Sequence, residues 1–179
     1  MTKLHLGCGP NRLEGYINID KFVEHPEVKR YDIFDLPYEA GTVDEILSEH
    51  MLEHLSFEEE KLFWEECYRV LSPGGTLKIE TPDFEWLCQA FLEGREDSYE
   101  FYSVGSKDHY FGNGRSIEHR WGMITTHFFG NQNGEGQFHK TGYSKGKFVL
   151  VSNLLGFRSC EVVKIFNKGA QALVATLVK

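Results

Sequence analysis

The chain has 179 residues, of which 41% are hydrophobic and 26% are charged, so we expect a single folded domain over residues 1–179 and exclude disordered and fibrous proteins. Nineteen lysines and arginines stand against 27 aspartates and glutamates, and the net charge of −8 argues against binding to a nucleic acid backbone. The sequence has no run of about 18 apolar residues and no apolar N-terminal segment, which predicts no membrane partner.

The first predicted element is a short strand that breaks into a glycine loop. Residues 3–6 alternate between polar and apolar side chains and are followed by the Gly-Cys-Gly-Pro of residues 7–10. A second strand over residues 15–20 ends on an acid, Asp20. Only residues 11–14 separate the loop from this strand. Because a parallel crossover usually needs about a dozen residues, we expect a loop or a single turn there rather than a helix.

Two further strands and a capped helix come next. Residues 28–34 predict a third strand, which ends before Asp35, and residues 43–48 predict a fourth. Ser56 and Glu59 have the spacing of a helix-capping box. The helix is expected to stop at the Pro-Gly-Gly that precedes the fifth strand. Its apolar positions at helical spacing are Leu62, Phe63, Cys67, Val70 and Leu71.

A long segment without periodicity interrupts the pattern in the second half. Residues 76–80 predict the fifth strand, and after Pro82-Asp83 an amphipathic stretch runs through Trp86, Leu87, Ala90, Phe91 and Leu92. Residues 93–143 are rich in Gly, Tyr, Phe, His and Asn and show neither helical nor strand spacing. Long irregular segments in compact domains are usually lids or binding loops, so we expect a lid or a binding insertion here.

The last elements are a helix and a pair of strands. Residues 144–155 predict a helix that ends at Gly156, and residues 160–166 and 172–178 predict a closing hairpin. Strands that alternate with helices and end in a hairpin predict an α/β fold whose sheet is mainly parallel with one antiparallel strand. Ligands of such sheets bind at the carboxyl ends of the strands, near the point where strand order reverses.

The predicted strand ends carry groups that suit a nucleoside. Gly7 and Gly9 would let backbone N–H groups approach a ligand closely, and a purely structural turn is the alternative. Asp20 could accept hydrogen bonds from both hydroxyls of a ribose. Asp35 could accept one from an adenine amino group while an apolar neighbour packs on the ring, and a loop-capping aspartate is the alternative.

Four motifs follow one another between residues 4 and 84. They are Leu4 to Gly9; Gly15 to Asp20; Asp35 to Tyr38 running on to Val43–Ile46 and Leu52–Leu55; and Arg69 to Gly75 leading into Ile79 and Pro82-Asp83. In this order and spacing they resemble the class I S-adenosylmethionine-dependent methyltransferases, in particular compact members with a Leu-Gly-Cys-Gly loop. The segment around His139 and Leu154-Leu155-Gly156-Phe157 is similar to the closing helix and strand of that family.

The resemblance implies a Rossmann-like seven-stranded sheet and S-adenosylmethionine as cofactor. The chain departs from the family pattern at two places, with His5 where an acid often stands and Asn11 where a third glycine is frequent. The lost glycine fits the shortened crossover. The residues that the resemblance places at the cofactor are Gly7, Cys8 and Gly9 around it, Asp20 at the ribose, Asp35 and Leu36 at the adenine, and Ser48 and Glu49 at the methionine part.

Methyl transfer from a sulfonium needs alignment of the nucleophile, the methyl carbon and the sulfur, with a base if the nucleophile is a hydroxyl. Histidine can accept a proton near neutral pH. His139 is the first catalytic candidate because it precedes the closing helix, and His50 is the second; His109 and His127 are also available. The alternative is a histidine hydrogen-bonded to the backbone of a lid.

The end of the fourth predicted strand carries two histidines and two acids that could hold a metal ion. His50 and His54 are four residues apart beside Glu49 and Glu53, but the order is not the H-E-x-x-H of zinc peptidases. Because Glu53-His54 matches a family motif that is not a metal site, we expect no metal.

The acceptor is expected to be a small molecule or a saccharide-type compound, methylated on oxygen or nitrogen, and an anionic acceptor is one option.

The four cysteines are far apart, which predicts a reducing, cytoplasmic location. Alternatives are a noncatalytic cofactor-binding subunit completed by a partner chain, because strand one begins at Lys3 without an N-terminal cover, and a nicotinamide-dependent oxidoreductase, which the missing third glycine disfavours. The oligomeric state is not predicted. Residues expected at the acceptor are the aromatic Tyr102, Tyr110, Phe111, Trp121 and Phe128 and the basic Arg115, Arg120, Lys140, Lys145 and Lys147.

Overall fold

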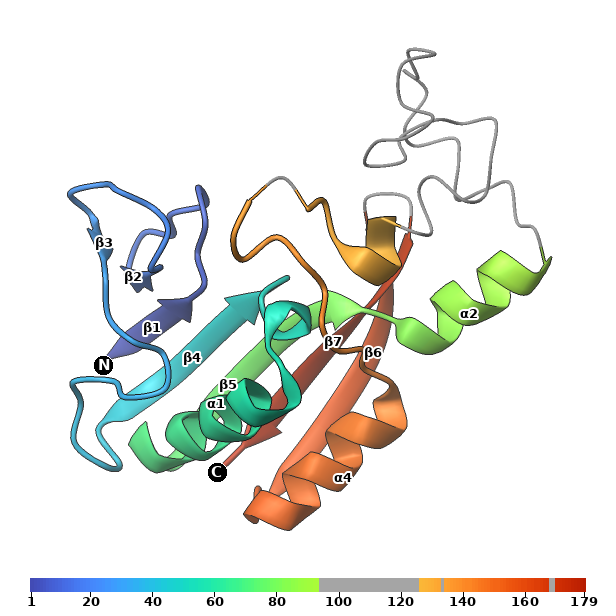
Figure 1. Ribbon diagram of the computed structural model, residues 1–179. Helices are drawn as coiled ribbons and strands as arrows, with labels where there is room; N and C mark the ends of the chain where they lie inside the picture. The colour runs from blue at the N-terminus through green and yellow to red at the C-terminus, as the bar shows by residue number, and fades with distance from the viewer. Residues whose placement is uncertain (94–125, 133, 168–169) are drawn as a thin grey trace.

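Seven strands form one sheet in the order β3-β2-β1-β4-β5-β7-β6 (Figure 1). The computed structural model describes residues 1–93, 126–132, 134–167 and 170–179. Among the described strands, β7 runs opposite to the others: its pairs with β5 and β6 are antiparallel, and the remaining neighbouring pairs are parallel. The predicted α/β, Rossmann-like sheet with an antiparallel C-terminal strand is confirmed. The strands are β1 (Lys3–Leu6), β2 (Ile17–Ile19), β3 (Val28–Lys29), β4 (Val43–Glu49), β5 (Leu71–Pro82), β6 (Ser159–Asn167) and β7 (Ala170–Val178).

The predicted caps are found at the start of α1 (Phe57–Val70) and at both ends of the last helix. Ser56 accepts a hydrogen bond from the Glu59 N–H, and the Glu59 carboxylate accepts one from the Ser56 N–H at 2.7 Å, which completes the predicted capping box. The last helix follows Ser144 as N-cap and ends at Gly156, which has a left-handed φ of 85°. The described helices are η1 (Leu52–His54), α1 (Phe57–Val70), α2 (Phe84–Glu93) and α4 (Lys145–Leu155).

Helices α1 and α4 lie in front of the sheet in Figure 1 and share one core with it. Trp64 of α1 and Phe148 of α4 pack edge to face, with ring centroids 6.2 Å apart. Leu62, which the spacing predicts as a core position, is 48% exposed because it lies away from the buried stripe that contains Phe63 and Cys67. Among the described residues, no helix combines the length and apolar character needed to cross a bilayer.

The third strand is much shorter than predicted. It covers only Val28–Lys29, and the residues that follow form a turn in which Asp32 Oδ1 accepts the Phe34 N–H at 3.0 Å and the Asp32 carbonyl accepts the Asp35 N–H at 3.3 Å. An aspartate that bonds to the backbone two residues ahead favours a turn over a ladder. The apolar spacing of residues 31–34 therefore belongs to a loop.

Helix α1 and strand β5 also meet earlier than predicted. The helix ends at Val70, and β5 already starts at Leu71, which takes an extended conformation with φ −61° and ψ 134°. The Pro-Gly-Gly expected to stop the helix instead lies within the described start of β5. Gly74 has a φ of 81° there, and its N–H donates to the Lys179 carbonyl at 2.9 Å.

The end of the predicted insertion returns to the sheet. Of residues 93–143, the described part includes one helical turn at residues 126–129. Two isolated bridges then pair Gly130 with Phe138 and Asp83 with Tyr143. A role of this segment as an insertion at the site remains a prediction, because residues 94–125 lie outside the described residues.

Candidate functional site

A cavity of about 780 Å³ opens at the carboxyl ends of the central strands. Its walls include residues 7–11 after β1, Asp20 after β2 and residues 49–51 at the end of β4. The segment before α4 contributes Thr126, His127, Gly130, Asn131, Glu135, Gly136, Gln137, His139 and Lys140. The strand order reverses at β1, whose neighbours β2 and β4 lead to opposite edges of the sheet. Binding sites of open α/β sheets lie at such a reversal, and small-molecule sites have volumes of roughly 300–1,000 Å³. The cavity is therefore the candidate site.

The glycine loop lines the cavity, but its amides are already used. Gly7 and Gly9 have left-handed φ values of 65° and 54°. The N–H groups of Gly7 and Cys8 both donate to the Ile19 carbonyl, at 2.9 and 3.1 Å, and the Gly9 N–H donates to Asp20 Oδ2 at 2.9 Å. The expectation that these N–H groups face a ligand is wrong, because the short connection ties the loop directly to the end of β2.

Asp20 organises the loops on both sides of its strand. Besides the Gly9 N–H, its carboxylate accepts the N–H groups of Phe22 at 2.8 Å and Val23 at 3.2 Å, both on Oδ1. An ionised carboxylate can accept about four hydrogen bonds, so Oδ2 retains capacity for one more donor. The side chain is 9% exposed and lines the cavity.

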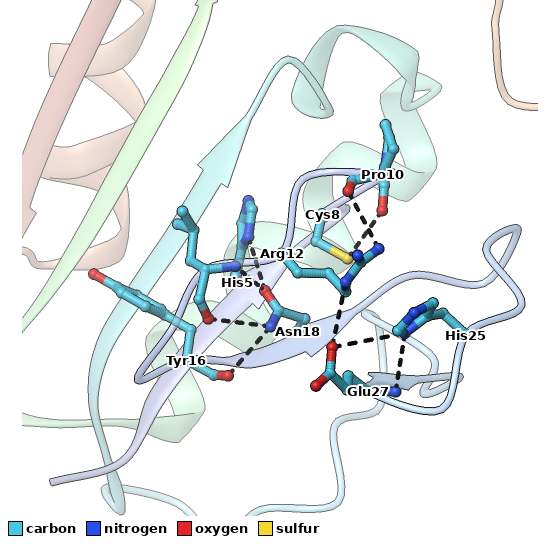
Figure 2. A network of polar contacts seen from close by, with 10 residues as sticks. His5, Cys8, Pro10, Arg12, Tyr16, Asn18, His25 and Glu27 are labelled. Carbon is cyan, nitrogen blue, oxygen red and sulfur yellow. Dashed lines mark hydrogen bonds and ion pairs between the residues drawn. The ribbon is translucent and has the colours of Figure 1, made fainter.

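Side chains take the place of a crossover helix between β1 and β2. Figure 2 shows Asn18 at the centre of this network, where its Oδ1 accepts the Leu13 N–H at 3.0 Å and its Nδ2 donates to the Leu13 carbonyl at 3.2 Å. The His5 side chain donates a hydrogen bond from Nδ1 to the same amide oxygen, Asn18 Oδ1, at 3.2 Å. Farther along, Arg12 Nε lies 3.4 Å from the Glu27 carboxylate, which joins the loop to the approach to β3. The predicted helix-free connection is confirmed.

The acid beside the third strand end differs from the one expected. Asp32 lines the cavity together with Tyr31, Ile33 and Phe34. Asp35 is exposed and Leu36 is 2% exposed, and neither lines the cavity. The reason is the turn at Asp32, which ends the strand early and carries the chain away from the cavity. The Leu36 N–H donates instead to the buried Glu66 carboxylate, at 2.6 Å.

Glu49, the last residue of β4, places a carboxylate beside His5 of β1. His5 stands at the position where the methyltransferase family often has an acid. Glu49 lines the cavity, and its Oε2 lies 3.9 Å from Nε2 of His5. Burial lowers the pKa of His5 despite its hydrogen bond to Asn18, which favours the neutral imidazole. Ser48 is fully buried outside the cavity lining, and among the described residues its hydroxyl has no hydrogen-bond partner.

His50 is held as a cation between two acids. It has a left-handed φ of 50°, and its Nδ1 and Nε2 lie 3.3 Å from Glu53 and 3.1 Å from Glu80. Burial lowers its pKa, but the hydrogen bonds to the two carboxylates outweigh burial and raise the pKa to about 9. With both nitrogens engaged and protonated near neutral pH, His50 is poorly suited to accept a proton.

The charge on His50 predicts a pH-dependent stability. Its folded pKa is raised above the ordinary 6.5, so its stabilisation is fully present below about pH 6.5 and is lost as the pH rises through about 9. We expect the melting temperature of wild type to fall more steeply over this range than that of His50→Gln. Differential scanning calorimetry at a series of pH values measures the melting temperatures of both proteins. His25→Gln is the control, and parallel curves for wild type and His50→Gln would contradict the ion pairs.

A second corner of the cavity brings together residues far apart in the chain. Ligand atoms of Glu53, His54 and His139 lie within 4.8 Å of one another, and all three residues line the cavity. Nδ1 of His139 lies 2.6 Å from the His127 carbonyl, and burial lowers the pKa of His139. His139 is thus a neutral imidazole whose Nδ1 carries the proton. Glu53 and His54 could be picked out from the sequence because they are adjacent. No sequence pattern connects either residue to His139.

The cavity is lined by more acidic than basic side chains among the described residues. Lys140 lines it and pairs with Glu59 at 3.0 Å, whereas Lys145 and Lys147 do not line it. The charged residues of the lining are Asp20, Asp32, Glu49, Glu53, Glu59, Glu80 and Glu135 against Lys21 and Lys140, besides the histidines. Phe128 is described and does not line the cavity. The remaining predicted acceptor residues, Arg115, Arg120, Tyr102, Tyr110, Phe111 and Trp121, and the candidate base His109 lie outside the described residues.

A family model and solved structures both relate this chain to methyltransferase domains. Residues 17–79 match the family model for a methyltransferase domain. No curated protein matches the chain in sequence. Among solved structures, the 1,6-didemethyltoxoflavin-N1-methyltransferase of Burkholderia thailandensis, with bound 1,6-didemethyltoxoflavin and S-adenosylhomocysteine, superposes with a TM-score of 0.62 at 17% identity, covering 99% of this chain and 70% of that chain.

Two archaeal structures agree with this. A methyltransferase of Methanosarcina mazei has a TM-score of 0.63 at 14% identity and covers 99% of this chain and 92% of its own, and one of Archaeoglobus fulgidus has a TM-score of 0.60 at 17% identity with 99% and 86% covered. Both are described as S-adenosylmethionine-dependent. At these identities the likeness establishes the class I methyltransferase fold of this chain.

Proposed function

We propose that this chain, built on the class I methyltransferase fold, transfers a methyl group from S-adenosylmethionine to oxygen or nitrogen of a small-molecule or saccharide-type acceptor. The observation that carries the proposal is the cavity at the strand-order reversal, where the glycine loop, Asp20 and Asp32 line one wall. That wall offers a closely approaching backbone and two carboxylates, which suit a nucleoside. The match of residues 17–79 to a methyltransferase domain supports the same conclusion.

The cofactor would lie across the ends of β1, β2 and β4. The remaining acceptor capacity of Asp20 Oδ2 suits a ribose hydroxyl, and Asp32 suits the adenine amino group in the place predicted for Asp35. Glu49 is the candidate partner of the methionine ammonium group, because it supplies at the end of β4 the carboxylate that His5 lacks. A lining with excess acid also favours a cationic sulfonium.

The acceptor would occupy the corner formed by Glu53, His54 and His139. Bound next to it, S-adenosylmethionine supplies the methyl group, whose carbon bonds to the acceptor oxygen or nitrogen as its bond to sulfur breaks. The acceptor proton needs a destination, and Nε2 of His139 can take it because Nδ1 already donates to the His127 carbonyl. The acidic lining favours a neutral or cationic acceptor over the anionic one that the sequence left open.

Titration calorimetry of the full chain with S-adenosylmethionine and S-adenosylhomocysteine tests the proposal. We expect saturable binding of both, and no binding of either would overturn the proposed function. Turnover is then measured as S-adenosylhomocysteine released in the presence of a panel of hydroxyl and amine acceptors. Cofactor binding without turnover across the panel would favour the noncatalytic subunit instead.

The adenine position gives a sharper version of this titration. Asp32→Asn replaces an acceptor oxygen of the cavity wall by a donor and is expected to weaken cofactor binding about tenfold. Asp35→Asn is the matched control, because Asp35 is exposed and lies outside the cavity lining, and it should leave the affinity unchanged. Weaker binding by Asp35→Asn together with unchanged binding by Asp32→Asn would assign the adenine contact to Asp35 and would leave the proposed reaction unchanged.

A further inference from the structure

We propose that Glu53, His54 and His139 form a binding site for one divalent metal ion of the zinc type, with an open coordination position toward the cavity. The three residues come from η1 and from the segment that follows Phe138, and they meet although His139 is remote in sequence. Two imidazoles and one carboxylate are a ligand set that zinc uses in catalytic sites.

The spacing of the three groups suits an ion after a small adjustment. Their ligand atoms lie within 4.8 Å of one another. Zinc bonds of about 2.0–2.2 Å in a tetrahedron bring ligand atoms to roughly 3.4 Å from one another, so side-chain movements on the order of 1 Å would close the site. The rings of His54 and His139 are edge to face, with centroids 4.7 Å apart, and can move without displacing a strand.

Both imidazoles are already held in the tautomer that binds a metal. Nδ1 of His54 donates to the Phe138 carbonyl at 3.1 Å, and Nδ1 of His139 donates to the His127 carbonyl at 2.6 Å. In a neutral imidazole, a proton on Nδ1 leaves the lone pair of Nε2 available for a metal ion. Metal-binding histidines almost always donate their other ring N–H in this way, which fixes the ring and raises its basicity.

Glu53 is oriented by its own neighbours. It is 2% exposed, its Oε2 accepts the Thr81 hydroxyl at 3.1 Å, and its Oε1 lies 3.3 Å from protonated His50. Among the described residues, neither His54 nor His139 makes a hydrogen bond to Glu53, so the three groups converge without satisfying one another.

Three protein ligands leave one position for an acceptor atom. This step rests on the proposed function: an acceptor hydroxyl bound to the ion would lose its proton to water more readily, since the ion lowers its pKa. The resulting oxygen would bond to the methyl carbon as the bond from that carbon to sulfur breaks and S-adenosylhomocysteine leaves. His139 then acts as a ligand rather than as the base. The inference favours acceptors with an oxygen donor beside or at the methylated position, and it revises the expectation that no metal binds.

Metal binding can be tested without cofactor or acceptor. The untagged full chain, stripped with a chelator, is titrated with Co²⁺ while visible absorption is recorded, and Zn²⁺ is added in competition. We expect one equivalent of Co²⁺ with tetrahedral absorption bands that Zn²⁺ abolishes. His54→Gln and His139→Gln should each weaken binding at least about tenfold, as loss of a metal-site partner does. His25→Gln is the matched control, because His25 lies outside the cavity lining and contacts Glu27.

Unchanged Co²⁺ binding in both cavity variants, or equal loss in His25→Gln, would overturn the site. Melting curves of the metal-free variants check folding, and His54→Gln alone decides the outcome if His139→Gln is destabilised. Addition of azide to the Co²⁺ protein should shift the absorption bands, and an unchanged spectrum would overturn the open position. Because S-adenosylmethionine binding is titrated separately on metal-free protein, failure of the metal site and failure of the proposed function give different results.

Discussion

Replacing Asp20 by asparagine is expected to lower the affinity for S-adenosylmethionine by about ten- to a hundredfold, the equivalent of one or two charge-assisted hydrogen bonds. The carboxylate accepts three backbone N–H groups, from Gly9, Phe22 and Val23, and keeps capacity for a ribose hydroxyl. An asparagine has only one acceptor oxygen, so its NH₂ group would face a backbone donor, and the glycine loop would keep its two bonds to the Ile19 carbonyl but could lose the bond from the Gly9 N–H. Titration calorimetry measures the affinity.

Two measurements distinguish the loss of cofactor contacts in Asp20→Asn from a general loss of the fold. Chemical unfolding of Asp20→Asn should remain cooperative, since the residue lies at a strand end and outside the main hydrophobic cluster. Asp35→Asn, the exposed neighbouring acid, should bind the cofactor as wild type does. Cofactor affinity that does not respond to Asp20→Asn would place the ribose elsewhere and remove the main support for the cofactor arrangement.

Gly7→Ala is expected to reduce the free energy of unfolding by about 2–4 kcal/mol. Gly7 has a φ of 65°, in the left-handed region that disfavours a Cβ atom, and an added Cβ would lie 2.2 Å from Cγ of Met51. Both the backbone and the packing against Met51 would have to change. Denaturant unfolding followed by fluorescence measures the loss.

Gly9→Ala is the matched control for this substitution. Its φ of 54° is also left-handed, but an added Cβ would meet nothing within 4 Å. We therefore expect only the backbone cost, about 1–2 kcal/mol. Equal destabilisation by the two variants would contradict the close contact between Gly7 and Met51.

Sequence reasoning succeeded where the signal is local. The capping box at Ser56 and Glu59 and the terminator Gly156 depend on a few consecutive residues, and both are found in the structure. The missing crossover helix followed from chain length alone, because residues 11–14 cannot span a helical connection. These features need no knowledge of distant contacts.

The errors arise where a distant or polar contact overrides the apolar pattern. Residues 31–34 look like the continuation of β3, but the Asp32 side chain bonds to the Phe34 N–H and turns the chain, which moved the cavity acid from Asp35 to Asp32. The corner of Glu53, His54 and His139 depends on tertiary folding, which places the segment after Phe138 beside η1. Spacing rules that compare neighbours along a helix do not reach such pairs.

The side-chain network around Asn18 and the three N–H bonds to Asp20 have an energetic consequence for any ligand of this cavity. The loop wall has its shape before anything enters, so the conformational entropy of ordering it is lost during folding and not on association. Affinity then depends on contacts and on displaced water, with little penalty from rearrangement. By the same reasoning, a substitution that frees the loop, at Asn18 for instance, would weaken binding without touching the ligand.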